Sequence, residues 1–501
     1  MEDGEFPLTH PFYTPHRLLS DLLAGNKRIL ERIVTLAGES APGGNLHHLL
    51  LVGPAGSGKS HLAALAAARL ERLTPASGRP LVARLPEDPW GITSFPDLLL
   101  QACRALEGRD PVVEILPSTS RGKDLSPAEA ARLAEERLRE AAGKRPLVLI
   151  LENADQVFAA LGEEGQKAFR SFLQQDPFTA VVATSRRLFD AVTRRTAPFY
   201  GFFRVEHLEP LHSREALNLA GKIFRKLGVP PGETPASRPE AAAWVRAVHH
   251  VSSGNTRFCL LFALALARGE TFEGAFFDAL DRVLHLYLAE LRDVSPQQKK
   301  ILDHLARREG SVQVKEIARG CLATEQTVSS QLRELRNAGL VSVTRMGRNS
   351  YYELTPPLLR LCLNLRQGKA ESIRLALHFL SHWFRPAKET DHRILESIQA
   401  GPGGGKWEKT AAALLEEHEK KGTLASLSAA LVRSLAPLLS SHLGGGARRA
   451  WPEAWRKKGA RHPETALALA LMDAALGESP SQALLALPRE YRELLEGLVP
   501  A

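Results

Sequence analysis

The chain has 501 residues, enough for about three domains. Its 44% hydrophobic and 24% charged residues are ordinary for a soluble globular protein. The net charge of +9 is compatible with an acidic partner but does not identify one. No apolar run approaches the ~18 residues of a membrane span, and residues 1–5 are acidic, without a signal-peptide core. Four scattered cysteines lack metal spacing. We therefore expect a cytoplasmic protein with reduced thiols and no membrane partner.

The first 44 residues form a predicted N-terminal segment. Residues 11–15 are expected to be extended, and residues 16–37 have the pattern of one helix. No motif in this segment assigns it a ligand.

A phosphate-binding motif follows. Residues 53–60, Gly-Pro-Ala-Gly-Ser-Gly-Lys-Ser, fit the P-loop pattern G-x-x-x-x-G-K-[ST]. The apolar run 49–52 predicts a strand before it, and the Ala/Leu-rich segment 61–70 predicts a helix after it. Glycines let backbone N–H groups close around a phosphate, and the helix N-terminus adds its positive end. A chance match in a Gly-rich turn is the alternative, but both flanks favour a nucleoside triphosphate site.

Each residue of the motif has an expected part. Lys59 is expected to reach the β- and γ-phosphates of ATP, and the Ser60 hydroxyl to hold Mg²⁺. The predicted nucleotide-binding residues are Gly53, Pro54, Ala55, Gly56, Ser57, Gly58, Lys59, Ser60 and His61.

Further strands and helices alternate along residues 45–211. Strands are predicted at 80–85, 147–151, 180–183 and 202–205, with helices at 95–106 and from the Ser126 capping box to residue 142. This alternation predicts an α/β core with a parallel sheet and helices on both faces.

A carboxylate and an amide follow the strand at 147–151. A Walker B motif would place Asp-Glu there, but this chain has Glu152 and Asn153. Glu152 is predicted to orient the Mg²⁺ shell, and Asn153 can orient a water but cannot take its proton. Two alternatives stay open: Glu152 only caps the strand, or it reaches the water itself and leaves the metal to Ser60 and solvent. Hydrolysis is therefore expected to be slow or to need help.

The pattern becomes helical after residue 211. Helices are expected at 214–227 and 239–249, with a Pro-rich linker at 229–235 and another helix opening at Ser253-Gly254-Asn255-Thr256-Arg257. Residues 212–290 are predicted to form a helical lid.

Residues 291–368 predict a winged helix-turn-helix. A helix after the Ser295 capping box, a second at 314–318 and a third from Thr324 precede two strands, 340–345 and 350–354. In the third helix Val328, Leu332 and Leu335 share an apolar face. The predicted DNA-binding residues are Thr327, Ser329, Ser330, Arg333, Arg345 and Arg348.

The charge of this segment favours DNA. Residues 295–366 hold 12 Lys and Arg against 6 Asp and Glu, so their net charge is +6 out of +9 for the chain. The alternative is that the winged helix is a packing module beside the lid. Residues 369–501 predict a helical region, either a weak helical-repeat interaction module or a closing bundle.

The order of motifs resembles the AAA+/STAND division of P-loop ATPases, and most of all initiator-type and archaeal-type ATPases with a C-terminal winged helix. The resemblance covers about residues 45–365. The winged segment resembles MarR-like regulators through Thr327-Val328-Ser329-Ser330-Gln331-Leu332 and Gly347-Arg348-Asn349-Ser350-Tyr351-Tyr352-Glu353-Leu354.

The resemblance implies further roles. Thr184, after the strand at 180–183, would be the sensor of the γ-phosphate, and Arg257 would be the lid's sensor cation, although it also fits an ordinary surface arginine. Arg194 or Arg195 would be an arginine finger for a neighbouring subunit, or part of a solvated basic loop. The implied function is a nucleotide-controlled switch.

Two interpretations remain. The first is a DNA-associated ATPase whose ATP state sets the lid and winged helix. The second is a STAND-like signalling ATPase in which the winged helix packs and the helical tail binds a protein partner. In either interpretation the ATPase core or the tail can mediate self-assembly.

Overall fold

The structure is a computed structural model. It describes residues 11–73, 79–87, 90–107, 126–175, 177–292, 294–308, 310–386, 392–394, 396, 405–441, 462–476 and 484–496. The chain divides into two compact units, Met1–Pro210 and Leu211–Ala501. None of the helices in the described ranges combines the length and apolar character needed to cross a membrane.

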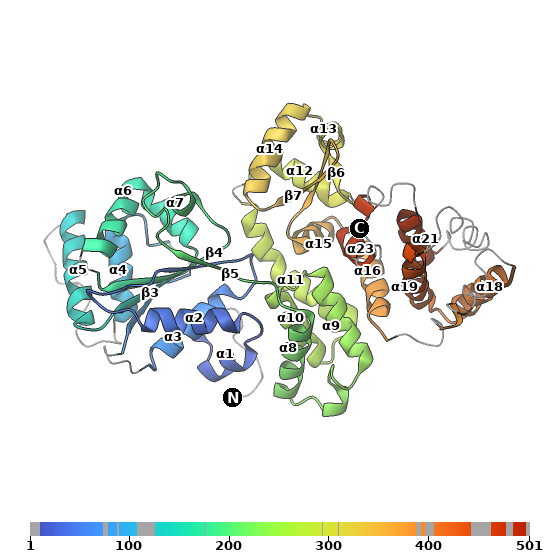
Figure 1. Cartoon of the computed structure of the whole chain (residues 1–501), viewed down its shortest axis with the longest axis horizontal. Helices are drawn as coiled ribbons and strands as arrows, with labels where there is room; N and C mark the ends of the chain where they lie inside the picture. The colour runs from blue at the N-terminus through green and yellow to red at the C-terminus, as the bar shows by residue number, and fades with distance from the viewer. Residues whose placement is uncertain are drawn as a thin grey trace. The chain divides into compact units, whose positions relative to one another are not determined.

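The first unit is a five-stranded parallel sheet between two layers of helices (Figure 1). Its strands are β1 (Leu49–Val52), β2 (Leu81–Arg84), β3 (Leu147–Leu151), β4 (Thr179–Ser185) and β5 (Arg204–His207). Its helices are η1 (Pro11–Tyr13), α1 (His16–Leu22), α2 (Lys27–Gly38), α3 (Lys59–Leu70), α4 (Phe95–Leu106), α5 (Pro127–Ala142), α6 (Ala154–Gln175) and α7 (Asp190–Thr193). The strand order is β2-β3-β4-β1-β5.

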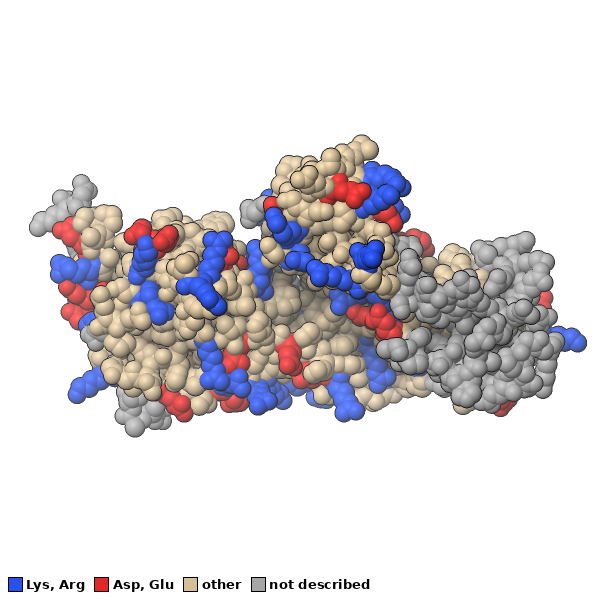
Figure 2. Space-filling view, turned by 45° about the horizontal axis from the view of Figure 1, so that its top comes forward, with Lys and Arg blue, Asp and Glu red and all other residues tan. Residues whose placement is uncertain are grey.

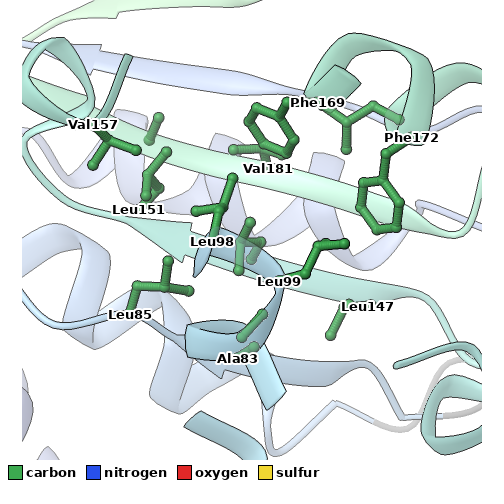
Figure 3. Packing of buried hydrophobic residues seen from close by; sticks show 14 of the residues in the cluster. Ala83, Leu85, Leu98, Leu99, Leu147, Leu151, Val157, Phe169, Phe172 and Val181 are labelled. Carbon is green, nitrogen blue, oxygen red and sulfur yellow. The ribbon is translucent and has the colours of Figure 1, made fainter. Parts of the chain in front are cut away.

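Both faces of this sheet are buried, which explains the nearly continuous apolar strands. In β3, Leu147, Leu149 and Leu151 face the layer of α4, α5 and α6. Val148 and Ile150 face the opposite layer of α1, α2 and α3. Figure 3 shows the first layer from nearby, with leucines of α4 and phenylalanines of α6 packed over the strands. The predicted α/β fold of the P-loop ATPases is confirmed.

Most predicted elements of the first unit are confirmed, but the extended segment at 11–15 and the single helix at 16–37 are wrong, since Pro11–Tyr13 form η1. Gly25 and Asn26 adopt positive φ angles of 68° and 50°, which break the helix into α1 and α2. The Gly-Asn pair could have shown this break, since both residues tolerate left-handed backbone. The last strand also begins later than expected, at Arg204, where its pairing with β1 starts and the Arg204 N–H donates to the His48 carbonyl at 2.8 Å.

The second unit begins with helices and continues into the winged helix-turn-helix. The first helices are α8 (Ser213–Lys226), η2 (Pro231–Glu233), α9 (Pro239–Val251), α10 (Thr256–Ala267) and α11 (Phe272–Glu290). The winged helix comprises α12 (Pro296–Arg307), β6 (Val312–Gln313), α13 (Val314–Cys321), α14 (Glu325–Asn337), β7 (Val341–Met346), β8 (Asn349–Leu354) and α15 (Pro357–Arg366). The short strand β6, which the sequence did not reveal, pairs with β8 and completes an antiparallel sheet β6-β8-β7.

The remaining described helices are α16 (Ala370–Trp383), α18 (Gly405–Lys420), α19 (Leu424–Ser441), α21 (Pro463–Leu476) and α23 (Arg489–Glu496). The predicted glycine breaks at 401–404 and 444–446 lie outside the described residues. The helical character expected after residue 369 is confirmed for the described part.

Helix α23 contacts the winged helix through partly buried ion pairs. Arg492 Nη2 donates to both carboxylate oxygens of Glu353 in β8, at 2.8 and 2.9 Å. Glu490 accepts from Arg360 of α15, with Nη2 to Oε1 at 2.6 Å. Just before α23, the Leu485 carbonyl accepts from the Ser311 N–H at 2.8 Å, beside β6. The tail and the winged helix are therefore packed together.

Candidate nucleotide site and DNA-contact surface

The P-loop joins β1 to α3, and its backbone has no room for larger residues. A Cβ at Gly53 would lie 2.8 Å from Ser57 Oγ and 3.2 Å from Leu208 Cβ. Gly58, the N-cap of α3, has a φ of 95°, where an L side chain is strained. The loop therefore turns tightly into the positive end of α3, which starts at Lys59 rather than at His61.

Lys59 is held against the loop. The residue is only 8% exposed, and its Nζ donates to the carbonyls of Gly53 at 2.7 Å and Pro54 at 2.9 Å. These contacts keep the ammonium in the concave part of the loop. A phosphate bound there would meet a positive charge whose position is already set.

Ser60 and Glu152 meet at the end of β3. Ser60 Oγ donates to Glu152 Oε2, while Glu152 Oε1 is buried without a hydrogen-bond partner among the described residues. Burial raises the pKa of Glu152 to about 7, and the charge of Glu87 also raises it, whereas the Ser60 hydrogen bond and the charge of Lys59 lower it. A hydroxyl and a carboxylate oxygen without a partner are ligands that suit Mg²⁺. The residues present therefore fit this metal.

Thr184 and Asn153 stand on neighbouring strands at the same edge. Leu151 pairs with Ala183, so the residues that follow each of them lie side by side. The Asn153 N–H donates to Thr184 Oγ1 at 3.3 Å, which leaves the proton of this buried hydroxyl for another acceptor. The Asn153 side chain points elsewhere: Nδ2 donates to the Glu87 carbonyl at 3.1 Å.

The side chains of the other residues predicted for this part of the site do not contact Lys59, Ser60, Glu152 or Thr184 in any described hydrogen bond. The His61 ring contacts the Leu19 carbonyl of α1, with Nε2 and O 2.9 Å apart, and burial lowers its pKa. Any nucleotide contact of His61 would then come from its backbone. Arg194 pairs with Asp190 at 2.6 Å, and Arg195 is exposed.

Arg257 belongs to the second unit. It is half-buried in the first turn of α10, whose N-cap Asn255 accepts from the Phe258 N–H at 3.0 Å. Its role as a sensor of phosphate stays a prediction.

Helix α14, the third helix of the winged helix-turn-helix, has one buried side and one exposed side. Val328, Leu332 and Leu335 are buried, as the periodicity predicts. Of the side chains predicted to contact DNA, Thr327, Ser329 and Arg333 are exposed and Ser330 is half-buried. Thr327 also shares a hydrogen bond with the N-cap residue Thr324, with their Oγ1 atoms 2.8 Å apart.

The wing carries the two predicted arginines. Arg345 pairs with Ser350 across β7 and β8, Arg348 lies in the turn between these strands, and both side chains are exposed. In the part of Figure 2 that corresponds to the winged helix, Lys and Arg side chains lie among several Asp and Glu side chains. On the face that Figure 2 shows, the basic side chains of this domain therefore have acidic side chains near them.

No sequence motif marks Glu87. It follows β2, and its charge acts on Glu152 although the two residues are far apart in sequence. Only the pairing of β2 with β3 brings them to one edge. The order of strands in the sheet would have been needed to find this residue.

Comparisons with known proteins agree with these two regions. Residues 23–189 match the AAA ATPase domain family, and residues 292–348 match the MarR family. No match was found among curated proteins.

Several solved structures resemble the chain in fold. The Walker-type ATPase PABY2304 of Pyrococcus abyssi is 17% identical, with a TM-score of 0.48, and the match covers 69% of this chain and 99% of that one. The Orc1 protein of Aeropyrum pernix, solved in complex with DNA, is 14% identical over 71% and 96% of the two chains, with a TM-score of 0.39. Cdc6p of Pyrobaculum aerophilum is 15% identical over 72% and 99%, with a TM-score of 0.37.

The family matches coincide with the parallel sheet that carries the P-loop and with the helices of the winged domain. The chain therefore contains an AAA ATPase domain followed by a winged helix of the MarR family.

Proposed function

We propose that this protein binds ATP with Mg²⁺ and uses the nucleotide state to control the association of its winged helix with DNA. The observation that carries the first part is the meeting of Lys59, Ser60, Glu152 and Thr184 at one edge of the sheet. A buried ammonium, a hydroxyl paired with a carboxylate and a second hydroxyl are the groups that phosphoryl chemistry uses.

Each group has a part in this proposal. Lys59 holds the β- and γ-phosphates, and Ser60 and Glu152 hold the metal. The bound metal would neutralise charge that develops on the phosphates during hydrolysis. Thr184 donates its hydroxyl proton to a γ-phosphate oxygen or to the attacking water. Asn153 supplies no base, so hydrolysis is slow or draws a base from another residue.

The DNA part of the proposal is supported by the shape and charge of the winged helix. Short polar side chains on the exposed side of α14 can approach base edges, and the wing arginines can reach phosphates. The net charge of +6 over residues 295–366 supplies the non-specific attraction.

The nucleotide site is tested with Lys59→Ala. Loss of the ammonium should weaken ATP binding by about tenfold or more, equivalent to about 1.4 kcal/mol, in a calorimetric titration with Mg·ATP. Lys144→Ala, an exposed lysine of the same unit, is the matched control. Equal ATP affinity in both variants would refute the P-loop assignment.

The DNA part is tested by titrating the protein with duplex DNA at several salt concentrations, with and without Mg·ATP. Log affinity should fall linearly with log salt, and the affinity should differ between the two nucleotide conditions. Salt-dependent binding that ignores the nucleotide would keep the DNA contact and remove the switch.

The second candidate is a signalling ATPase in which the winged helix packs and the tail receives a protein. The ion pairs of Arg492 and Arg360 with their partners favour it, because they join the tail to the winged helix. They do not involve the exposed residues of α14 or the wing turn, so they are compatible with the first function. Absence of any DNA binding at low salt would promote this second candidate.

A further inference from the structure

The loop after β2 lies beside the acidic end of β3. Arg84, the last residue of β2, pairs with Ile150 of β3, and the Leu85 N–H donates to the Ile150 carbonyl at 3.1 Å. The third residue after each of these paired positions belongs to the loop that leaves its strand. These residues are Glu87 and Asn153.

Asn153 fixes this loop. Its side-chain Nδ2 donates to the Glu87 carbonyl at 3.1 Å, across 66 residues of sequence. Its own backbone has a φ of 48°, a left-handed conformation that Asn tolerates better than Glu does, and its N–H is bonded to Thr184. The amide at this position therefore acts as a tether between two strand ends.

The tethered residue carries a carboxylate. The Glu87 side chain is exposed, and among the described residues it has no hydrogen-bond or ion-pair partner. Its charge is felt by Glu152, whose pKa it helps to raise. Two carboxylates thus belong to the site: Glu152 is buried against Ser60, and Glu87 is open to water.

We propose that Glu87 is the general base of ATP hydrolysis and that Asn153 is the residue that positions it. This inference rests on the proposed nucleotide site. Glu87 accepts a proton from the attacking water as the water oxygen bonds to the γ-phosphorus. The bond from that phosphorus to the β–γ bridging oxygen breaks, and ADP leaves with the electron pair. The products are ADP and phosphate, and the proton passes from Glu87 to solvent.

In this arrangement Glu152 binds the metal and Glu87 accepts the proton. Glu152 accepts a hydrogen bond from the Ser60 hydroxyl, and in the proposed site its oxygens would be occupied as ligands of the metal. Asn153 has no proton-accepting carboxylate, and its amide is engaged with the loop. Glu87 has a carboxylate that is open to water, on a backbone that Asn153 holds at the end of β3. A general base must come within hydrogen-bond reach of the attacking water, and these two features allow Glu87 to do so.

The test is single-turnover hydrolysis of Mg·ATP by the full chain, with ATP affinity measured separately. Glu87→Gln keeps the size of the side chain and the backbone carbonyl that Asn153 holds. The rate should fall by about 10²- to 10⁴-fold while the affinity for ATP stays within about twofold. Glu39→Gln is the matched control and should retain the wild-type rate, because Glu39 is an exposed carboxylate of the same unit, at the end of α2.

The outcomes are distinct. A Glu87→Gln rate within about threefold of the control would overturn the assignment of the base. Wild-type protein that binds ATP without hydrolysing it would also overturn this assignment but leave the nucleotide site intact. Failure of the wild type to bind ATP would overturn the proposed function as well.

The positioning role has its own test. Asn153→Ala removes the hydrogen bond to the Glu87 carbonyl and should slow hydrolysis with little change in ATP affinity. The same substitution in the Glu87→Gln protein should lower the hydrolysis rate hardly any further. Such a non-additive pair indicates that both residues act through one group. Independent losses that multiply in the double variant would overturn the positioning role of Asn153.

Discussion

The candidate nucleotide site and the candidate DNA-contact surface of the winged helix differ in how far their functional groups are buried. At the sheet edge Lys59, Glu152 and Thr184 are buried, and each is held by a hydrogen bond to another part of the site. On the winged helix the residues predicted to contact DNA are mostly exposed, and the buried residues beneath them are apolar. Substitution of the buried groups in the first region should therefore alter stability as well as function, whereas substitution of the exposed residues in the second region need not alter stability.

The largest expected effect tests the scaffold of the winged helix. Leu332→Ala removes a buried side chain from α14 and should destabilise the second unit by about 2–5 kcal/mol. Ser329→Ala, three residues earlier on the exposed side, should alter stability by less than about 0.5 kcal/mol. Thermal unfolding of both variants measures this contrast, and similar losses in both would show that the two sides of α14 are not separable.

Glu152→Gln tests whether a functional group of the nucleotide site also affects the stability of the fold. Its carboxyl has a raised pKa, so the folded state holds a proton to higher pH than the unfolded state does. The nucleotide-free protein therefore loses stability as pH rises from about 4.5 to about 7, by about 3 kcal/mol in total. Glu152→Gln should remove this loss, so the variant is more stable than the wild type at pH 8 and equal to it near pH 4.

The same variant should bind Mg·ATP more weakly, since a neutral amide replaces a metal-binding carboxylate. Chemical denaturation across pH, followed by titration with Mg·ATP, measures both effects. A Glu152→Gln protein that gains no stability at pH 8 would mean that burial does not destabilise the charged form of this carboxylate.

The wing arginines should affect binding without affecting folding. Removing one arginine–phosphate interaction lowers the slope of log affinity against log salt by about one, so Arg345→Ala with Arg348→Ala should reduce it by about two. Arg214→Ala with Arg282→Ala, exposed arginines of α8 and α11, should leave the slope unchanged. Equal slopes in the wild type and the wing variant would assign the wing to packing.

The smallest effect concerns Leu322, in the turn between α13 and α14. This leucine is 89% exposed and has a φ of 51°, a conformation that costs an L side chain roughly 1 kcal/mol or more. Leu322→Asn should therefore raise the stability of the winged helix by up to about 1 kcal/mol. Weaker DNA binding by this more stable variant would show that the leucine contacts DNA.

The P-loop and the three buried apolar positions of α14 could be predicted because each depends on residues close in sequence. Glycine geometry, helix periodicity and capping are local, and the sequence displays them directly. Glu87 could not be predicted, because it meets Asn153 only through the pairing of β2 with β3. The strand β6 was missed for a similar reason. Its two residues are too few to show periodicity, and they form a strand only because they pair with β8.

The contact between α23 and the winged helix has a consequence for the order in which the protein folds during synthesis. Glu353 is translated 139 residues before Arg492, and Arg360 is translated 130 residues before Glu490. Until α23 leaves the ribosome, these charged groups lack the partners they have in the finished chain. A fragment that stops after the wing would meet the same difficulty, so the winged helix is best isolated together with α23.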